Sequence, residues 1–222
     1  MGTASTTVVV NNVAPTINAG ADAQLSSGQW LTVNATFTDP STADTHASTV
    51  NWCDGSPIQS VAIVQGAGSG SLTATHQYFV PATYTVTVCV TDDDGGVGCD
   101  TLQLVVKRLV VAIDIKPGSF PNSINLKNKG NVPVGVFTGV YAGVAFNATT
   151  IDRNSLLFAG ASDLGIGKSP QDVDGDGDMD MVFHFDTSAL NLTANSTEAC
   201  LTGVTLGGVA FIGCDSVRIL SK

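Results

Sequence analysis

Short stretches of alternating hydrophobic and polar residues recur along the first half of the chain, separated by turn-forming residues. Residues 30–37 place every second side chain, from Leu31 to Phe37, on one hydrophobic face. Residues 84–91 do the same from Val86 to Val90, and residues 49–52 and 101–104 supply two further short strands. Alternation with a period of two indicates strands that bury one face. The pattern predicts an antiparallel β-sandwich over residues 15–107.

The second half of the chain is also predicted to form short strands. They are expected at residues 109–115, 131–137, 155–158, 181–185 and 216–220. Pro133 lies inside the second of these, and because proline cannot donate to a ladder, that strand is predicted to lie at an edge or to start there. Long helical periodicities are absent. We therefore predict an all-β chain of two tandem antiparallel β-sandwich domains, 15–107 and 109–222, preceded by an extended strand and linker over residues 1–14.

Composition and charge limit the classes of partner and the cellular locations that the chain can have. The formal net charge of the 222-residue chain is −10, and only 13% of its residues are charged. A chain this poor in Lys and Arg cannot neutralise phosphates, so nucleic acid is excluded as a partner. No apolar run reaches the roughly 18 residues of a membrane helix, so no membrane insertion is expected. The first residues lack the apolar core of a signal peptide, so either a signal was removed or the chain is part of a longer secreted protein.

The five cysteines suggest disulfides of an oxidising compartment. Cys89 and Cys99 are equidistant from the predicted turn at 92–96, and Cys200 and Cys214 are equidistant from a turn near residue 207. Cross-strand bridges 89–99 and 200–214 are therefore expected. A bridge between Cys53 and Cys89 is the competing possibility. No C-x-x-C spacing suggests a zinc site. The expected location is extracellular or at the cell surface.

One run of residues carries the strongest chemical signal in the chain. Alternate positions of residues 172–180 are aspartates, with glycine at 175 and 177: Asp172, Asp174, Asp176, Asp178 and Asp180. The first three match positions one, three and five of a D-x-D-x-D-G calcium loop, with glycine at position six. Asp178 is expected to use its backbone carbonyl and Asp180 to act at position nine. The glutamate of a complete EF-hand is missing, since position twelve is Phe183. We predict a calcium ion that stabilises the structure and does not drive a conformational change.

The predicted first sandwich also resembles a known family. The resemblance rests on residues 18–22, 37–40, 44–46, 52–55, 76–78 and 84–97, which include the strings Phe-Thr-Asp-Pro, Trp-Cys-Asp-Gly and His-Gln-Tyr. Together they are similar to a PKD domain, which implies a seven-stranded immunoglobulin-like sandwich found in extracellular proteins. Cys53 and Ala82 depart from the usual pattern. Some PKD-like domains bind calcium near such loops, so the resemblance permits a second calcium site at Asp39, Asp92 and Asp94. The alternative is that residues 92–94 form a polar hairpin turn.

The second half resembles a recurring C-terminal module of bacterial and archaeal secreted proteins. The resemblance rests on residues 113–126, on the aspartate run, and on residues 198–202 and 213–217. It implies no catalysis. None of the three histidines lies in a catalytic motif, so the protein is not expected to be an enzyme. Four sequons offer possible glycosylation sites: Asn34, Asn147, Asn191 and Asn195.

The valine-rich N-terminus has the composition of a strand without a sheet of its own. Residues 7–11, written Thr7, Val8, Val9, Val10 and Asn11, could add to the edge of another copy by β-strand donation. Such head-to-tail contacts propagate as a filament when they do not close into a ring. The leading hypothesis is a calcium-stabilised structural or adhesive protein that self-assembles in this way. The alternative is an accessory binding or spacer module of a larger secreted hydrolase, or a piece of a tandem-repeat surface protein, with neighbouring domains of the same chain as its partners.

Overall fold

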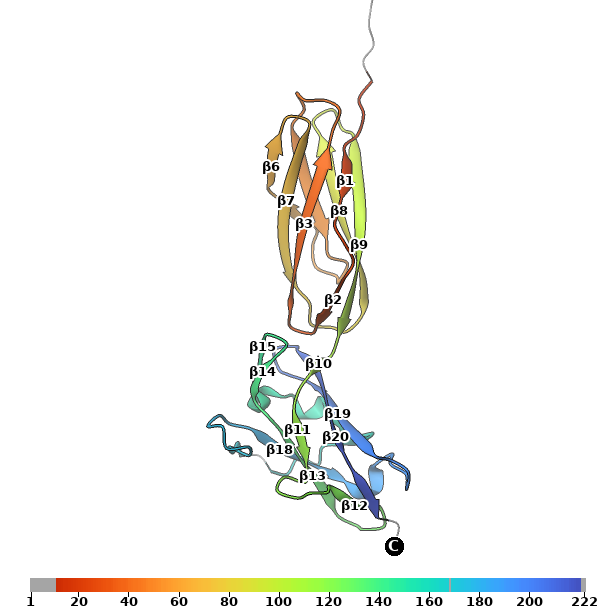
Figure 1. The fold of residues 1–222 in the computed structure, drawn as a ribbon, viewed down its shortest axis with the longest axis vertical. Coiled ribbons are helices and arrows are strands. Elements are labelled where there is room, and N and C mark those ends of the chain that lie inside the picture. Colours follow the sequence, from red (N-terminus) through yellow and green to blue (C-terminus); the bar gives the residue numbers. More distant parts are fainter. Residues whose placement is uncertain (1–10, 168, 221–222) are drawn as a thin grey trace, which may run out of the picture. The chain divides into compact units, whose positions relative to one another are not determined.

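A computed structural model describes residues 11–167 and 169–220 and is nearly all β, as predicted (Figure 1). The described chain divides into two compact units. The first contains residues up to 24, residues 30–76 and residues 83–105, and the second contains residues 25–29, 77–82 and those from 106 onward. No helix among the described residues has the length and apolar character that crossing a membrane requires.

The N-terminal sandwich has two sheets with strand orders β1-β3-β7-β6 and β2-β9-β8-β4-β5, and the pairs β1–β3, β6–β7, β4–β5, β4–β8 and β8–β9 are antiparallel (Figure 1). The strands are β1 (Thr16–Asn18), β2 (Ala23–Ser26), β3 (Trp30–Thr38), β4 (His46–Asn51), β5 (Gln59–Val61), β6 (Ile63–Gly66), β7 (Ser69–Gln77), β8 (Thr83–Asp92) and β9 (Val97–Lys107). Their alternating side chains form the core. Leu31, Val33, Ala35 and Phe37 of β3 are buried, as are Val86, Val88 and Val90 of β8. The predicted inward faces of these two strands are confirmed.

The second unit contains more and shorter elements. Its strands are β10 (Leu109–Val110), β11 (Ile113–Ile115), β12 (Ser123–Asn125), β13 (Asn131–Val136), β14 (Gly139–Tyr141), β15 (Val144–Phe146), β16 (Leu157–Phe158), β17 (Ala161–Ser162), β18 (Met181–Asp186), β19 (Glu198–Val204), β20 (Ala210–Ser216) and β21 (Arg218–Leu220), and its 3₁₀ turns are η1 (Ala148–Thr150), η2 (Arg153–Ser155) and η3 (Thr187–Ala189). The principal sheets are β10-β20-β19-β16-β17 and β11-β13-β18. They enclose one hydrophobic core, in which Phe158, Phe183, Phe185 and Phe211 are fully buried.

Three expectations for this unit were wrong in detail. The strand around Pro133 is central and not at an edge, because β13 pairs with both β11 and β18. Proline is tolerated there because β11 stops at Ile115, opposite Val134, and beyond that pair Pro133 contributes only its carbonyl, to Lys116 N. The predicted strand 109–115 is interrupted at 111–112. Only Leu157 and Phe158 of the segment 155–158 are strand, because Ser155 ends the 3₁₀ turn η2.

Both expected disulfides are present, Cys89–Cys99 between β8 and β9 and Cys200–Cys214 between β19 and β20. In each pair the two cysteines lie directly opposite each other in the strand register. This pairing excludes the competing bridge to Cys53, whose thiol is free and exposed. Each disulfide fixes the register of one hairpin, and cross-links of this kind stabilise a fold mainly by restricting the unfolded chain.

Candidate metal centre

The aspartate run forms the loop that leads into β18. Gly175 and Gly177 have φ angles of +83° and +99°, a conformation that side chains with a Cβ rarely adopt. The loop closes on itself because Gly175 N donates to Asp172 Oδ1 (2.7 Å) and Gly177 N donates to Asp172 Oδ2 (3.2 Å). The two glycines therefore allow the sharp turns that bring the alternate carboxylates toward one another.

Three of the five predicted ligands converge. One carboxylate oxygen from each of Asp172, Asp174 and Asp176 lies within 4.8 Å of the other two, and all three residues are exposed. The hydrogen bonds of this group come from backbone N–H groups of the loop itself, and none of the described lysines or arginines forms an ion pair with it. The result is a concentrated negative charge with oxygen-only ligands, the donor set that calcium prefers.

Asp180, the expected ninth-position ligand, accepts hydrogen bonds from backbone groups on two segments. Its side chain is completely buried, and its two oxygens accept hydrogen bonds from Thr138 N and Val173 N, each at 2.9 Å. Gln171 and Asp180 also exchange backbone hydrogen bonds, which join the two ends of the loop. One hydrogen bond to each oxygen ties Asp180 to the loop and leaves each oxygen a second acceptor site, so ligation by Asp180 stays a prediction.

The side chain of Asp178 has an oxygen that the loop leaves unpartnered. Its Oδ1 is buried and has no hydrogen-bond partner. Desolvation, followed by repulsion from Asp176 and Asp180, raises the pKa of its carboxyl above the ordinary value. Desolvation and repulsion from its neighbours also raise the pKa of Asp174. A bound cation would offset both the unpartnered buried oxygen and the repulsion among these carboxylates. The residues present therefore fit a calcium ion, which Asp172, Asp174 and Asp176 would hold with Asp178 beside them.

A second acidic group lies in the first unit. Asp39 follows β3, Asp92 ends β8, and Asp44 lies in the loop before β4; one oxygen of each is within 4.8 Å of the others. The structure thus brings together two of the three residues expected at a second calcium site and adds Asp44. Asp94 lines the same hollow of about 390 Å³ but lies outside the three-carboxylate group.

This second group is largely supplied with partners by the protein. The buried Asp39 carboxylate accepts from Ser41 N and lies 3.2 Å from His46 Nε2, with both side chains inaccessible to solvent. Asn12 Nδ2 donates to both oxygens of Asp92, at 3.0 and 2.9 Å. That bond, offset in part by desolvation and aided by backbone donors of residues 94–96, lowers the pKa of Asp92. Asp44 Oδ2 and His46 Nδ1 are the two atoms of this group that are buried without a partner among the described residues. The second calcium site stays a prediction.

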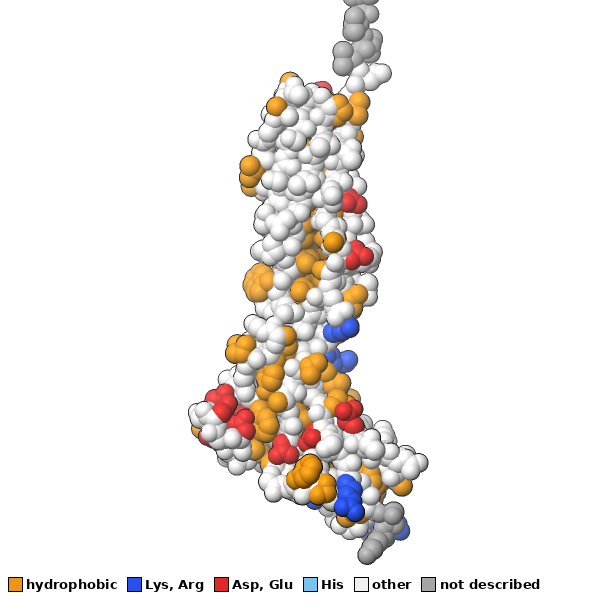
Figure 2. All heavy atoms as spheres, viewed as in Figure 1, with side chains coloured by type: hydrophobic (Ala, Val, Ile, Leu, Met, Phe, Trp, Pro, Cys, Tyr) orange, Lys and Arg blue, Asp and Glu red, His pale blue; other side chains and the backbone are white. Residues whose placement is uncertain are grey.

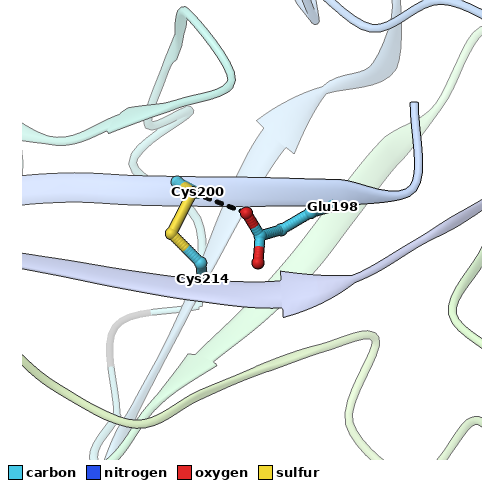
Figure 3. Close-up of side chains that lie close together, drawn as sticks. All are labelled: Glu198, Cys200 and Cys214. Atoms are coloured by element: carbon cyan, nitrogen blue, oxygen red, sulfur yellow. Dashed lines mark hydrogen bonds between the residues drawn. A yellow bond between two sulfur atoms is a disulfide. The ribbon is translucent and has the colours of Figure 1, made fainter.

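A third cluster of ligand-type side chains is not a metal site. Figure 3 shows Glu198 beside the Cys200–Cys214 disulfide, with a carboxylate oxygen 4.0 Å from Cys200 Sγ. A disulfide sulfur carries no hydrogen to donate and is not the thiolate that ligates metals. Both sulfurs are therefore used in the disulfide of the hairpin. The contact of Glu198 with Cys200 is an ordinary contact between two side chains of β19.

The other predicted positions are distributed as follows. Thr7, Val8, Val9 and Val10 lie outside the described residues, and Asn11 is exposed and outside any strand. The four sequon asparagines Asn34, Asn147, Asn191 and Asn195 are all exposed. His76 stacks on Trp52, with ring centroids 5.0 Å apart, and its Nε2 lies 2.6 Å from Asp54 Oδ2, which agrees with the expected packing role.

Sequence reasoning missed Asp44 and Asn12 at the acidic group of the first unit. Asp44 follows Asp39 by five residues in a loop, a spacing that matches no metal motif. Asn12 was assigned to a linker, yet it contacts Asp92 across 80 positions of sequence. Only the fold brings these residues together, so no local pattern could have found them. The free side-chain oxygen of Asp178 was missed because the motif assigns that position a backbone ligand.

Comparisons with known proteins give one family match and several weak structural likenesses. No curated protein matches the chain. Fibronectin(III)-like modules of CbhA from Clostridium thermocellum are similar at 15% identity over 94% of both chains, with a TM-score of 0.32. SGBP-B from a mixed-linkage glucan utilization locus of Bacteroides ovatus, solved with a mixed-linkage heptasaccharide, is 14% identical over 96% of this chain and 48% of that chain, with a TM-score of 0.29. The M1 domain from titin is 15% identical over 43% of this chain and 96% of that chain, with a TM-score of 0.31.

These TM-scores are too low to assign a fold or a function to the chain. The family match is informative for the first unit. The family model described as PKD domain matches residues 12–106. The matched segment begins at Asn12, the residue that donates to Asp92, and extends to the end of β9. Residues 12–106 thus have the sequence pattern of a PKD domain and a two-sheet, immunoglobulin-like arrangement, although the sandwich has nine strands where the resemblance implied seven.

Proposed function

We propose that this protein is an extracellular structural module whose C-terminal unit is stabilised by calcium at the 172–180 loop. The observation that carries the proposal is the convergence of Asp172, Asp174 and Asp176 without a basic partner among the described residues. The PKD match and the two disulfides support an extracellular binding or spacer role. In this role the calcium ion neutralises the loop and holds the segment before β18 in one conformation.

Limited proteolysis of the full chain tests the calcium part directly. We expect a protease that cuts exposed, mobile segments to cleave within residues 163–180 after EGTA treatment and to spare them when calcium is added. The variant Asp176→Asn keeps the shape of the side chain and removes one ligand charge, so calcium should no longer protect it. Glu198→Gln removes an exposed acidic charge of the same unit outside the loop and should behave as the parent. Equal cleavage of the parent with and without calcium would contradict the proposal.

We propose further that copies assemble head to tail, with residues 7–11 of one copy adding to a sheet edge of the next. The described acceptor best suited to this is β6, whose outer side has no strand partner among the described residues (Figure 1). Val64 on β6 is 75% exposed, so the edge offers an apolar neighbour for a valine-rich strand. Unpaired strand edges are templates for added strands, and alternating valines would set the register.

Assembly is tested by electron microscopy and light scattering of the purified chain with calcium. Deletion of residues 1–10 removes the donor but keeps Asn12 and its bonds to Asp92, so the first unit stays intact. We expect fibres from the parent, none from the deletion variant, and none from Val64→Lys, which places a charge on the acceptor edge. Val9→Pro should block assembly because proline removes a ladder donor, whereas Val9→Thr should allow it. Fibres from the deletion variant, or a parent that stays monomeric, would overturn this part while leaving the calcium loop untouched.

A further inference from the structure

Two of the motifs singled out in the second half of the chain meet in the fold. Residues from the string 113–126 and from the string 213–217 line one hollow of about 500 Å³ in the second unit. Its lining includes Asp114 of β11, Asn122 before β12 and Asp215 near the end of β20, with Ser119 and Phe120 from the connecting loop. None of these residues belongs to the 172–180 loop, so the hollow is a separate feature.

Asn122 is the feature of this hollow that requires a partner. Its side chain is only 4% exposed, and its Nδ2 donates to Asp215 Oδ2 (2.8 Å) and to the carbonyl of Ser216 (3.0 Å). Because both neighbours are acceptors, the amide cannot be turned over without placing oxygen against oxygen. Oδ1 is thereby fixed in place, and it is buried with no hydrogen-bond partner. A buried carbonyl oxygen left in this state is unfavourable, and a ligand that reaches it would offset that cost.

The rest of the hollow is acidic. Asp215 is already engaged, since Oδ2 also accepts from Ile115 N (3.0 Å) and Oδ1 from Ser216 N (2.6 Å). Asp114 has the free capacity, because the Gly118 N–H is its one donor among the described residues. Desolvation, and then the nearby charge of Asp215, raise the pKa of Asp114. None of the described residues that line the hollow is Lys, Arg or His. The site therefore presents acceptor oxygens and negative charge with no internal counter-charge.

We propose that this hollow binds a hard divalent cation of the calcium class through the Asp114 carboxylate and Asn122 Oδ1. Asp215 is a positioning residue, because its carboxylate holds the Asn122 amide in the orientation that exposes Oδ1 to the ion. Carboxylate and amide oxygens are ligands of calcium, which takes six to eight oxygens in a flexible geometry. The protein supplies few of these oxygens, and the open hollow has room for the waters that complete the shell.

A monatomic ion fits better than an organic cation. Asn122 Oδ1 has almost no accessible surface, so a bulky ammonium or guanidinium group could not approach it without displacing the loop. With two direct protein ligands, the affinity should fall in the weak range of extracellular calcium modules, about 0.1–1 mM. The site would join β11, the loop 116–122 and the end of β20, and so link the two ends of the second unit's chain.

The test is a calcium titration followed by amide NMR on the full chain carrying Asp176→Asn, which disables the loop site. We expect the amides of Gly118 and Ser119 to shift and to saturate near millimolar calcium. Adding Asp114→Asn keeps an acceptor for Gly118 N but removes the ligand charge, and should weaken the response at least tenfold. Adding Glu198→Gln, an acidic residue of the same unit outside the hollow, should leave it unchanged.

Each outcome decides the question. Shifts that saturate and disappear with Asp114→Asn support the site, even if the loop at 172–180 fails to bind calcium in the parent. An absence of shifts up to tens of millimolar calcium would mean that water alone occupies Asn122 Oδ1, and shifts that survive Asp114→Asn would place the ion elsewhere. If Nα-acetyl-lysine amide, and not calcium, moves these amides, the ligand is an organic cation and the proposal is wrong. Unchanged dispersion of the metal-free spectrum confirms that each variant is folded.

Discussion

The two units contain acidic groups of similar size but opposite character. In the first unit, Asp39 and Asp92 are buried and receive a histidine, an asparagine and backbone donors as partners. In the second, Asp172, Asp174 and Asp176 are exposed and receive only the N–H groups of their own loop. Figure 2 shows how few Lys and Arg side chains lie among the acidic ones on the visible face. The first unit thus supplies most of the partners of its buried carboxylates from the protein, whereas the exposed loop supplies only backbone donors, and we assign the remaining role there to an ion.

The largest expected difference is the response to calcium. Binding stabilises the native state by about 2.7 kcal/mol at a hundredfold excess over the dissociation constant, and it should do so in the second unit. Both tryptophans of the chain, Trp30 and Trp52, lie in the first unit. Trp52 is buried, so tryptophan fluorescence reports unfolding there, while far-UV circular dichroism reports both units. We expect EGTA to shift part of the circular dichroism transition and to leave the fluorescence transition in place.

The first unit should depend instead on Asn12. The variant Asn12→Ala removes both hydrogen bonds that Nδ2 makes to Asp92 and leaves this buried carboxylate with backbone donors alone, which should cost about 1–2 kcal/mol in the free energy of unfolding. Urea unfolding followed by fluorescence measures the loss. Asn11→Ala, at the exposed neighbouring position, is the control and should be silent. A silent Asn12→Ala variant would show that Asp92 is not held by this contact.

The sandwich of the first unit could be predicted well because alternation dictates which side chains face inward. Val86, Val88 and Val90 are fully buried, and the hairpin of β8 and β9 places Cys89 opposite Cys99. The second unit was harder because many of its strands have two or three residues, too few for alternation to define them. The aspartate loop could be recognised from the sequence because its residues are close together in the chain. The partners of Asp92 and Asp215 come from distant segments, and only tertiary structure assigns them.

A smaller difference between the two units is expected in how their stability depends on pH. Asp54 in the first unit is desolvated, but hydrogen bonds from Ser56 and His76 more than offset this and lower its pKa to about 2. Its contribution is therefore present at neutral pH and is lost as the pH falls through its unfolded value toward about 2. The raised pKa values of Asp174 and Asp178 act in the opposite direction: the metal-free loop gains stability as the pH falls from neutral through those values. Unfolding curves in EGTA at several pH values should show the two signs, and a common sign in both probes would contradict the comparison.

The smallest effect is expected at Cys53. This exposed residue has a φ angle of +61°, which is unfavourable for any residue with a Cβ. Cys53→Gly should relieve this strain and so stabilise the protein. The gain in the free energy of unfolding should stay below about 1 kcal/mol, because glycine loses more chain entropy on folding. Cys53→Ser keeps the Cβ and should be neutral. A loss of stability in the serine variant would reveal a role for the thiol that the structure does not show.

The most direct test of the account is isothermal titration of calcium into the EGTA-stripped full chain and two charge variants. Asp176→Asn removes a carboxylate that has no basic partner, and Asp44→Asn removes one from the partnered group of the first unit. We predict that the tightest binding event is lost or weakened at least tenfold, about 1.4 kcal/mol, in Asp176→Asn and is unchanged in Asp44→Asn. Tight binding that survives Asp176→Asn, or that disappears with Asp44→Asn, would contradict the claim that the exposed loop is the principal calcium site.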